Sequence, residues 1–265
     1  MRIDVAFTPV GLSPAAVHGR TVFVVDILRA TTVMCAALHH GAKALIPVGS
    51  TEEALRLAQT IGKTDVLLAG ERNCQRIAGF HLGNSPLEVT ERAVKGKTII
   101  VTTSNGTKAL LACQGAGAVY PAAAANLSMA AERAREAIDA AQQILVVCAG
   151  RADSFALDDA YCAGRLVAAT LGDRKARPGL NDAALASLDL VRRYGNQWER
   201  PLARSRGGRE LIKLGLRADL RDAARPDAYP VLPLFHERRV TLAEPSLPSL
   251  LSGQAVPSFP HSANA

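Results

Sequence analysis

The feature that most constrains this chain is a repeated unit in which a short apolar run is followed by a loop and a helical pattern. The unit recurs about six times before residue 172, and its apolar runs are rich in Val, Ile and Leu. Strands that alternate with helices in this way predict a mostly parallel sheet with helices on both faces. The sequence therefore predicts the α/β fold class.

The predicted elements follow this pattern along the chain. Strands are predicted over residues 3–7, 21–25, 44–48, 65–69, 97–102, 118–122 and 143–148, with a late strand over 229–234. Helices are predicted over residues 31–38, 50–61, 108–113, 126–140, 158–171, 183–193 and 208–214. The clearest helix start is Ser85 as N-cap, with Pro86 as the first helical residue and Glu88 as the third.

Length and composition indicate a globular protein with one main domain. Residues 1–243 are predicted to form a single α/β domain, and residues 244–265 a flexible tail rich in Pro and Ser. No apolar run reaches the roughly 18–20 residues of a membrane span, and the N-terminus lacks the pattern of a signal peptide. The five widely spaced cysteines argue against a disulfide framework or a zinc cluster. We therefore expect a cytoplasmic protein with reduced thiols and no membrane partner.

The net charge of +7 is concentrated between residues 172 and 240, and the rest of the chain is almost neutral. Arginines in this segment are not interleaved with aromatic residues and form no block of like charge. This pattern argues against nucleic acid as the partner. An anionic substrate, a contact between the subunits of a homodimer or a solvated face fits the segment better.

Polar residues gather where four of the predicted strands end. They are Asp26, Arg29, Thr31 and Thr32; Glu71 and Arg72; Thr103, Asn105, Gly106 and Thr107; and Arg151, which leads to Asp158 and Asp159. Ligands of parallel α/β sheets bind at the carboxyl ends of the strands, so these groups are expected to meet in one site. Oxygen ligands without paired His or Cys favour Mg²⁺ or Mn²⁺ over zinc, and arginines with helix N-termini suit phosphate. The residues thus predict a Mg²⁺-dependent enzyme acting on a phosphorylated or polyanionic small molecule.

Several of these residues also have a purely structural interpretation. Asp26 could cap the helix that follows it, and acids at 158 and 159 are favoured by the dipole of a first helical turn. Asn84 with Ser85 could form a helix cap, and Asn105 with the glycine after it an ordinary turn. The arginines could form structural ion pairs.

Five stretches in order resemble the 2-phosphosulfolactate phosphatase family over roughly residues 1–240. They are residues 26–32 (DILRATT), 70–73 (GERN), 79–86 (GFHLGNSP), 102–107 (TTSNGT), and 148–150 (CAG) with 157–159 (LDD). The resemblance implies a three-layer α/β/α fold with a mostly parallel, mixed sheet. It also implies Mg²⁺-dependent hydrolysis of 2-phosphosulfolactate to 3-sulfolactate and phosphate, which in methanogens lies on the route to coenzyme M.

With this resemblance, the site hypothesis assigns a role to each residue. Asp26, Glu71 and Asp159 are expected to hold Mg²⁺, with Asp158 as the alternative to Asp159, and Arg29 and Arg72 to neutralise charge in catalysis. Substrate binding is assigned to Thr31, Thr32, Asn84, Ser85, Thr103, Asn105, Gly106, Thr107 and Arg151. A further arginine from residues 192–217 is a candidate for the sulfonate or carboxylate of the substrate. Attack by water is the expected route and a phosphoryl-Asp26 intermediate the competing one.

The chain departs from the family pattern at four positions. Cys74 stands in place of a Gly, His81 of an Asp, Asp158 of a Glu and Ser104 of a Thr. The loss of an acid at 81 argues against that residue as a metal ligand. Three other functions are left open: a phosphatase for another small phosphorylated acid, a non-catalytic anion-binding or regulatory protein, and a nucleic-acid-binding protein.

Overall fold

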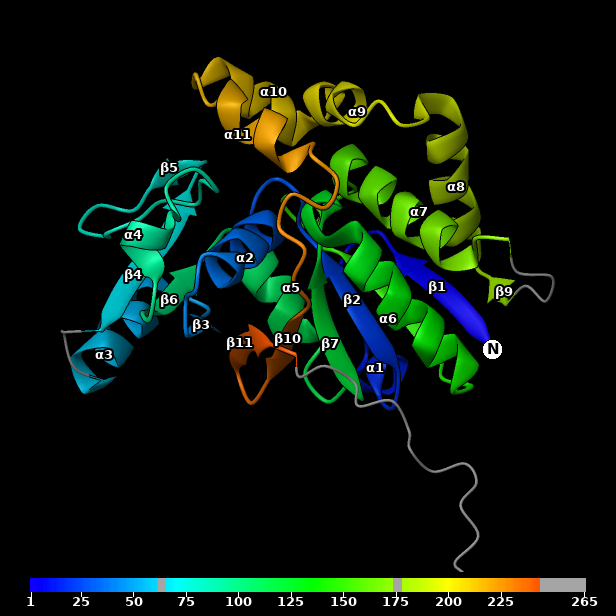
Figure 1. The fold of residues 1–265 in the computed structure, drawn as a ribbon, viewed down its shortest axis with the longest axis horizontal. Coiled ribbons are helices and arrows are strands. Elements are labelled where there is room, and N and C mark those ends of the chain that lie inside the picture. Colours follow the sequence, from blue (N-terminus) through cyan, green and yellow to red (C-terminus); the bar gives the residue numbers. More distant parts are fainter. Residues whose placement is uncertain (62–64, 174–177, 244–265) are drawn as a thin grey trace, which may run out of the picture.

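The computed structural model describes residues 1–61, 65–173 and 178–243, and one sheet of eleven strands runs through them (Figure 1). Its strands are β1 (Arg2–Ala6), β2 (Thr21–Val25), β3 (Ala44–Pro47), β4 (Val66–Arg72), β5 (Gln75–Arg76), β6 (Thr98–Thr102), β7 (Ala118–Ala122), β8 (Ile144–Cys148), β9 (Gly179–Leu180), β10 (Pro233–His236) and β11 (Arg239–Leu242). The strand order is β5-β4-β6-β3-β11-β10-β7-β2-β8-β1-β9. The predicted tail, residues 244–265, lies outside the described residues.

Helices cover both faces of this sheet, so the predicted α/β class is confirmed. They are α1 (Pro14–Val17), α2 (Ala30–His39), α3 (Thr51–Ile61), α4 (Glu91–Val94), α5 (Gly106–Ala112), the 3₁₀ turn η1 (Ala124–Asn126), α6 (Leu127–Asp139), α7 (Leu157–Leu171), α8 (Asp182–Tyr194), α9 (Glu199–Arg204), α10 (Arg206–Lys213) and α11 (Arg217–Ala223). Alternate residues of β2 show the layering. Val22 and Val24 belong to a core with α2 and α5, whereas Phe23 and Val25 belong to one with α6 and α7.

The sheet consists of two parallel halves joined by an antiparallel hairpin. Strands β4, β6 and β3 are parallel, as are β7, β2, β8 and β1, and the β10–β11 hairpin lies between β3 and β7. Buried Val240 pairs with Leu45, and buried Phe235 pairs with Val119. The late strand predicted over 229–234 is therefore wrong in its bounds. Tyr229 instead donates its backbone N–H to Ala125 and its hydroxyl to Asp222.

The helix predicted to begin at Ser85 does not form. Residues 86–88 make a turn, and the next helix, α4, begins only at Glu91. The Ser85 hydroxyl donates to the Asp219 carboxylate at 2.7 Å, and the Glu88 carboxylate accepts from the backbone N–H of Gly83. The Ser85 hydroxyl oxygen also accepts the N–H of Leu87 at 3.3 Å, so the local cap-like bond is present although no helix follows it.

Two further observations bear on the composition. All five cysteines are buried and free. In the described part of the chain, no helix is long and apolar enough to cross a membrane.

Helices α10 and α11, which are coloured orange in Figure 1, lie near the edge of the sheet where β2 and β4 end.

Candidate active site

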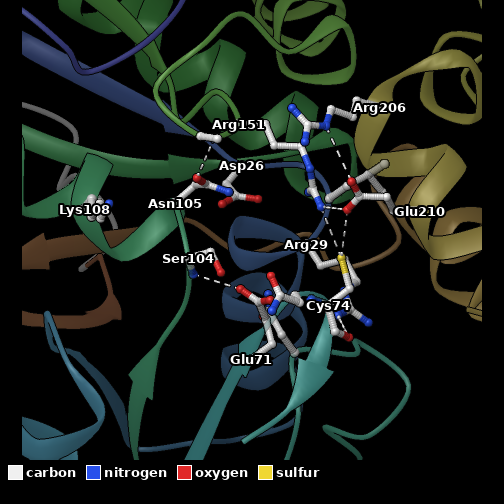
Figure 2. Close-up of a pocket in the computed structure, with 14 residues that line it drawn as sticks. Asp26, Arg29, Glu71, Cys74, Ser104, Asn105, Lys108, Arg151, Arg206 and Glu210 are labelled. Carbon is white, nitrogen blue, oxygen red and sulfur yellow. Dashed lines mark hydrogen bonds and ion pairs between the residues drawn. The ribbon is translucent and has the colours of Figure 1, made fainter.

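A cavity of about 260 Å³ lies where β2, β4 and β6 end (Figure 2). The loop after β8 and helix α10 also line it. Its charged lining residues are Asp26, Arg29, Glu71, Lys108, Arg151, Arg206 and Glu210, and its amides are Asn73, Asn84 and Asn105. The structure thus brings together six of the predicted site residues: Asp26, Arg29, Glu71, Asn84, Asn105 and Arg151. Lys108, Asn73 and Glu210 were not singled out from the sequence, whereas Arg206 falls in the segment 192–217 from which a further arginine was expected.

Asp26 follows the fully buried strand β2, and backbone contacts fix its side chain. Its Oδ1 accepts the N–H of Ala30 at 3.2 Å. A Cβ on residue 106 would come within 2.6 Å of Oδ2, so glycine allows α5 to approach the carboxylate this closely. Burial raises the pKa of Asp26 to about 7; the Ala30 N–H opposes this, and the negative charges of Glu71 and Asp158 add to it.

The predicted substrate-binding threonines shape the loops and do not line the cavity. Thr31 accepts from the backbone N–H of Asp26 at 3.1 Å, and Thr32 donates to the carbonyl of Ile27 at 2.9 Å. Thr107 donates its hydroxyl to the carbonyl of Thr103 at 3.0 Å and its N–H to the Thr103 hydroxyl at 3.2 Å. These buried hydroxyls hold the turns that carry Asp26 and the start of α5.

Glu71 at the end of β4 joins two loops at the floor of the cavity. Its Oε1 accepts the N–H of Ser104 at 2.8 Å and its Oε2 that of Cys74 at 2.7 Å. Arg72 is exposed and does not line the cavity. Its guanidinium donates to the Glu71 carbonyl and to the Thr102 hydroxyl, at 2.8 Å and 3.1 Å. His81 also lies away from the cavity, and its Nδ1 accepts the N–H of Leu68.

Asp159 is buried beside the site and does not line the cavity. Its two oxygens accept the N–H groups of Ile27 and Gly150, both at 3.0 Å, so it clasps the ends of β2 and β8. Asp158 is also buried, faces Gly207 of α10, and has an Oδ1 without a hydrogen-bond partner. Burial raises the pKa of Asp158 to about 6.

The predicted metal set of Asp26, Glu71 and Asp159 is therefore not assembled. Across residues 1–61, 65–173 and 178–243, no three His, Cys, Asp or Glu side chains are placed to hold a metal ion. Asp159 does not line the cavity that Asp26 and Glu71 share, although Glu71, like Asp159, accepts two backbone N–H groups. From the sequence alone, Asp159 could either hold the backbone of two loops or bind a metal ion, and no sequence pattern distinguished the two roles.

A smaller set of oxygen atoms does suit a hard divalent cation. Asp26 and Glu71 bring two carboxylates to one cavity, and the buried Asn84 Oδ1 that lines it has no hydrogen-bond partner. Buried carboxylates that repel one another gain from a cation between them, and carboxylate with amide oxygen is the donor set that Mg²⁺ prefers. These three residues fit the cation; Asp159 does not.

Arg29 is held in a buried ion pair, the structural role that the sequence had left open for it, with a partner that the sequence did not indicate. One guanidinium nitrogen pairs with Asp219 of α11, and the other donates to the carbonyl of Cys74 at 2.9 Å. Both side chains of the pair are almost fully buried. Asp219 also accepts the Ser85 hydroxyl. No motif marks Asp219, which lies 190 residues beyond Arg29.

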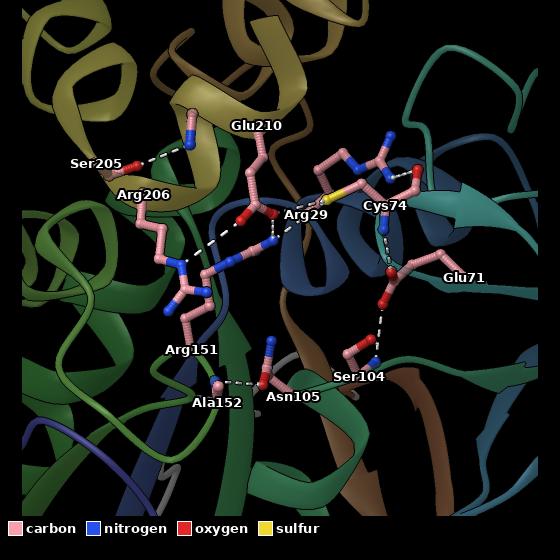
Figure 3. A network of polar contacts seen from close by, with 11 residues as sticks. Arg29, Glu71, Cys74, Ser104, Asn105, Arg151, Ala152, Ser205, Arg206 and Glu210 are labelled. Atoms are coloured by element: carbon pink, nitrogen blue, oxygen red, sulfur yellow. Dashed lines mark hydrogen bonds and ion pairs between the residues drawn. The ribbon is translucent and has the colours of Figure 1, made fainter. Parts of the chain in front are cut away.

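Glu210 joins two arginines on the opposite wall (Figure 3). Its Oε2 pairs with Arg151, and its Oε1 lies 3.5 Å from Nε of Arg206, one helical turn earlier on α10. The thiol of Cys74 lies 3.4 Å from the Arg151 guanidinium. Below them, Asn105 accepts the N–H of Ala152 at 3.2 Å.

This arrangement defines the class of the protein. Buried carboxylates and four cationic side chains share one cavity at the carboxyl ends of parallel strands, so the chain is an α/β protein with a highly charged cavity at the position where this fold binds ligands. The sequence pattern of the 2-phosphosulpholactate phosphatase family matches residues 6–238. The chain belongs to that family, as its resemblance predicted.

Curated relatives agree with this assignment, and each carries the name of a probable 2-phosphosulfolactate phosphatase. The relative from Symbiobacterium thermophilum is 40% identical over 238 residues, which cover 89% of this chain and 100% of the relative. The relative from Thermotoga maritima is 37% identical, covering 87% of this chain and 94% of its own. The relative from Clostridium acetobutylicum is 32% identical, covering 89% of this chain and 97% of its own.

Proposed function

We propose that this chain hydrolyses 2-phosphosulfolactate to 3-sulfolactate and phosphate. Family membership and the names of the relatives support a phosphatase. The observation that carries the proposal is the charge of the cavity, which Arg29, Lys108, Arg151 and Arg206 line together with the carboxylates of Asp26, Glu71 and Glu210. The proposed substrate bears a phosphate, a sulfonate and a carboxylate, so it needs several cations as well as a group that acts on the phosphate.

We further propose that Mg²⁺ is the cofactor and that Asp26, Glu71 and Asn84 hold it. When bound there, Mg²⁺ would neutralise charge that develops on the phosphoryl oxygens. The support is the donor set: two carboxylates and an unpartnered amide oxygen on residues that line the same cavity. Arg29 is committed to Asp219, so its part is to fix the loop after Asp26 and to add positive charge to the cavity.

The remaining cations act on the substrate directly in this proposal. Lys108 is exposed at the cavity and has no hydrogen bond or ion pair with any other described residue, so its ammonium is free to meet a phosphoryl oxygen. Arg151 is in position to meet an anionic group beneath α10. Phosphoryl transfer depends mostly on such positioning and charge neutralisation. Water is the proposed nucleophile, and a phosphoryl group trapped on Asp26 would overturn this route.

A phosphate-release assay over a panel of small phosphorylated acids tests the proposal. We expect the largest kcat/KM with 2-phosphosulfolactate, a lower value with 2-phospholactate, loss of turnover in EDTA and recovery on adding Mg²⁺. Faster release from another phosphorylated acid would favour a different substrate for the same site. Binding of inorganic phosphate without turnover of any ester would favour a non-catalytic anion-binding protein.

A further inference from the structure

Glu210 lies inside the candidate active site although it belongs to none of the strand ends. It projects from α10 into the cavity, where its two carboxylate oxygens meet Arg151 and Arg206 separately (Figure 3). Its side chain is 39% exposed, so the ion pairs form at the cavity wall and not in the core. Among the described residues, Glu210 is the only carboxylate paired with either arginine.

The close approach of α10 is built into the sequence of its first turn. At Gly207 a Cβ would come within 3.2 Å of Asp158 Oδ2 and 3.5 Å of Arg151 Nη1. The next residue, Gly208, is also buried and donates its N–H to the Ser205 hydroxyl at 2.9 Å. Gly207 lets the helix start against the arginine, and Gly208 lets it pack against the backbone of α9, where a Cβ would come within 1.9 Å of the Leu202 carbonyl oxygen. This packing places Glu210 one turn later beside the cavity.

A ligand anion can readily replace Glu210 in its ion pairs with Arg151 and Arg206. A partly exposed ion pair contributes little to stability, typically about 0.2–1 kcal/mol, because solvent screens it. A ligand carboxylate or sulfonate can replace the Glu210 carboxylate, because each offers two oxygens that accept parallel hydrogen bonds from one guanidinium. Without Glu210, Arg151 and Arg206 would lose the one ion-pair partner that each has among the described residues.

We propose that Glu210 is an internal competitor for the substrate and thereby a specificity-determining residue. Arg151 and Arg206 form a subsite for an anionic group that is not hydrolysed, and the Glu210 carboxylate fills this subsite until such a group displaces it. This inference rests on the proposed function for the identity of the ligand. A phosphate ester without a second anionic group cannot displace Glu210, so the residue favours substrates with an additional sulfonate or carboxylate.

Calorimetric titration of the full chain tests this with three probes: 3-sulfolactate, lactate and inorganic sulfate. We expect Glu210→Gln, which removes the charge but keeps the size, to tighten binding of 3-sulfolactate and sulfate about fivefold. Lactate, whose carboxylate is its one anionic group, should tighten no more than 3-sulfolactate does. In an Arg151→Gln background, Glu210→Gln should have little effect on any probe. Glu199→Gln is the matched control, because Glu199 lies on the neighbouring helix α9 and does not line the cavity.

The possible outcomes separate this inference from the proposed function. If Glu210→Gln weakens or leaves unchanged the binding of both 3-sulfolactate and sulfate, Glu210 is a structural tether and the inference is overturned. It is also overturned if the effect persists in the Arg151→Gln background. Absence of phosphate release from 2-phosphosulfolactate, together with tighter sulfate binding by Glu210→Gln, would overturn the proposed function alone.

Discussion

Asp26→Asn is expected to lower kcat for phosphate release by at least about 100-fold while leaving the chain folded. The change keeps the shape of the side chain and its contacts with Ala30 and Gly106 but removes the charge that faces the cavity. Positioning residues such as the buried threonines are untouched by it. The loss should therefore appear in turnover and not in the amount of folded protein.

The same variant has an expected stability profile with pH in the absence of divalent cations. Burial raises the pKa of Asp26 to about 7, so the folded chain holds this proton more tightly than the unfolded chain does. The contribution of Asp26 to stability is therefore greatest below its unfolded pKa, about 4, and is lost as pH rises through about 7. At pH 8 the Asn variant should be at least as stable as the wild type.

Two measurements check this prediction. Phosphate release gives kcat, and urea unfolding at pH 5 and pH 8 in EDTA gives the free energy of unfolding. The matched control is Asp189→Asn, an exposed carboxylate of α8 paired with Arg192, for which no change in kcat is expected. Wild-type turnover by a folded Asp26→Asn protein would remove Asp26 from the proposed chemistry.

Arg29→Gln is expected to cost about 3–5 kcal/mol of stability. The guanidinium and the Asp219 carboxylate are 4% and 3% exposed, so the substitution leaves a buried charge without its partner. It also removes the donor to the Cys74 carbonyl. Because α11 is joined to the strand ends through this pair, we expect kcat to fall as well.

Urea unfolding of three proteins checks the size of this effect. Arg192→Gln breaks an exposed ion pair and should cost at most about 0.5 kcal/mol. The double variant Arg29→Met with Asp219→Leu should recover much of the loss, because it leaves no unpaired charge. A loss below about 1 kcal/mol for Arg29→Gln would mean that water or another group compensates Asp219.

Local sequence patterns predicted the part of the site that lies at the strand ends. Asp26 and Glu71 follow buried apolar runs, and the topology of a parallel sheet brings such positions to one edge. The same rule placed Asn105 and Arg151 correctly at the cavity. No comparable rule decides which polar side chain at a strand end faces the cavity and which one holds the backbone.

Residues whose partners are distant in sequence were the ones mispredicted or missed. Ser85 has the local pattern of a helix cap and accepts the N–H of Leu87, but the chain makes only a turn there and the hydroxyl also donates to Asp219 of α11. Asp159 has the local pattern of a ligand, but it clasps two backbone loops. Glu210 reaches the cavity only because α10 packs over the strand ends, which no periodicity indicates.

The hairpin shows the same limit at the level of the fold. Strands β10 and β11 come last in the chain yet occupy the middle of the sheet, between β3 and β7. Their pairing with Leu45 and Val119 depends on contacts across more than a hundred residues. Sequence patterns therefore predicted the class of the sheet but not its order.

A crystal structure with 3-sulfolactate and inorganic phosphate together would test most directly whether this cavity is the active site. We predict phosphate beside Asp26 and Lys108, the sulfonate or carboxylate on Arg151 and Arg206, and the Glu210 carboxylate displaced from Arg151. Both ligands bound elsewhere on the molecule, with the cavity and the Arg151–Glu210 pair unchanged, would contradict this assignment.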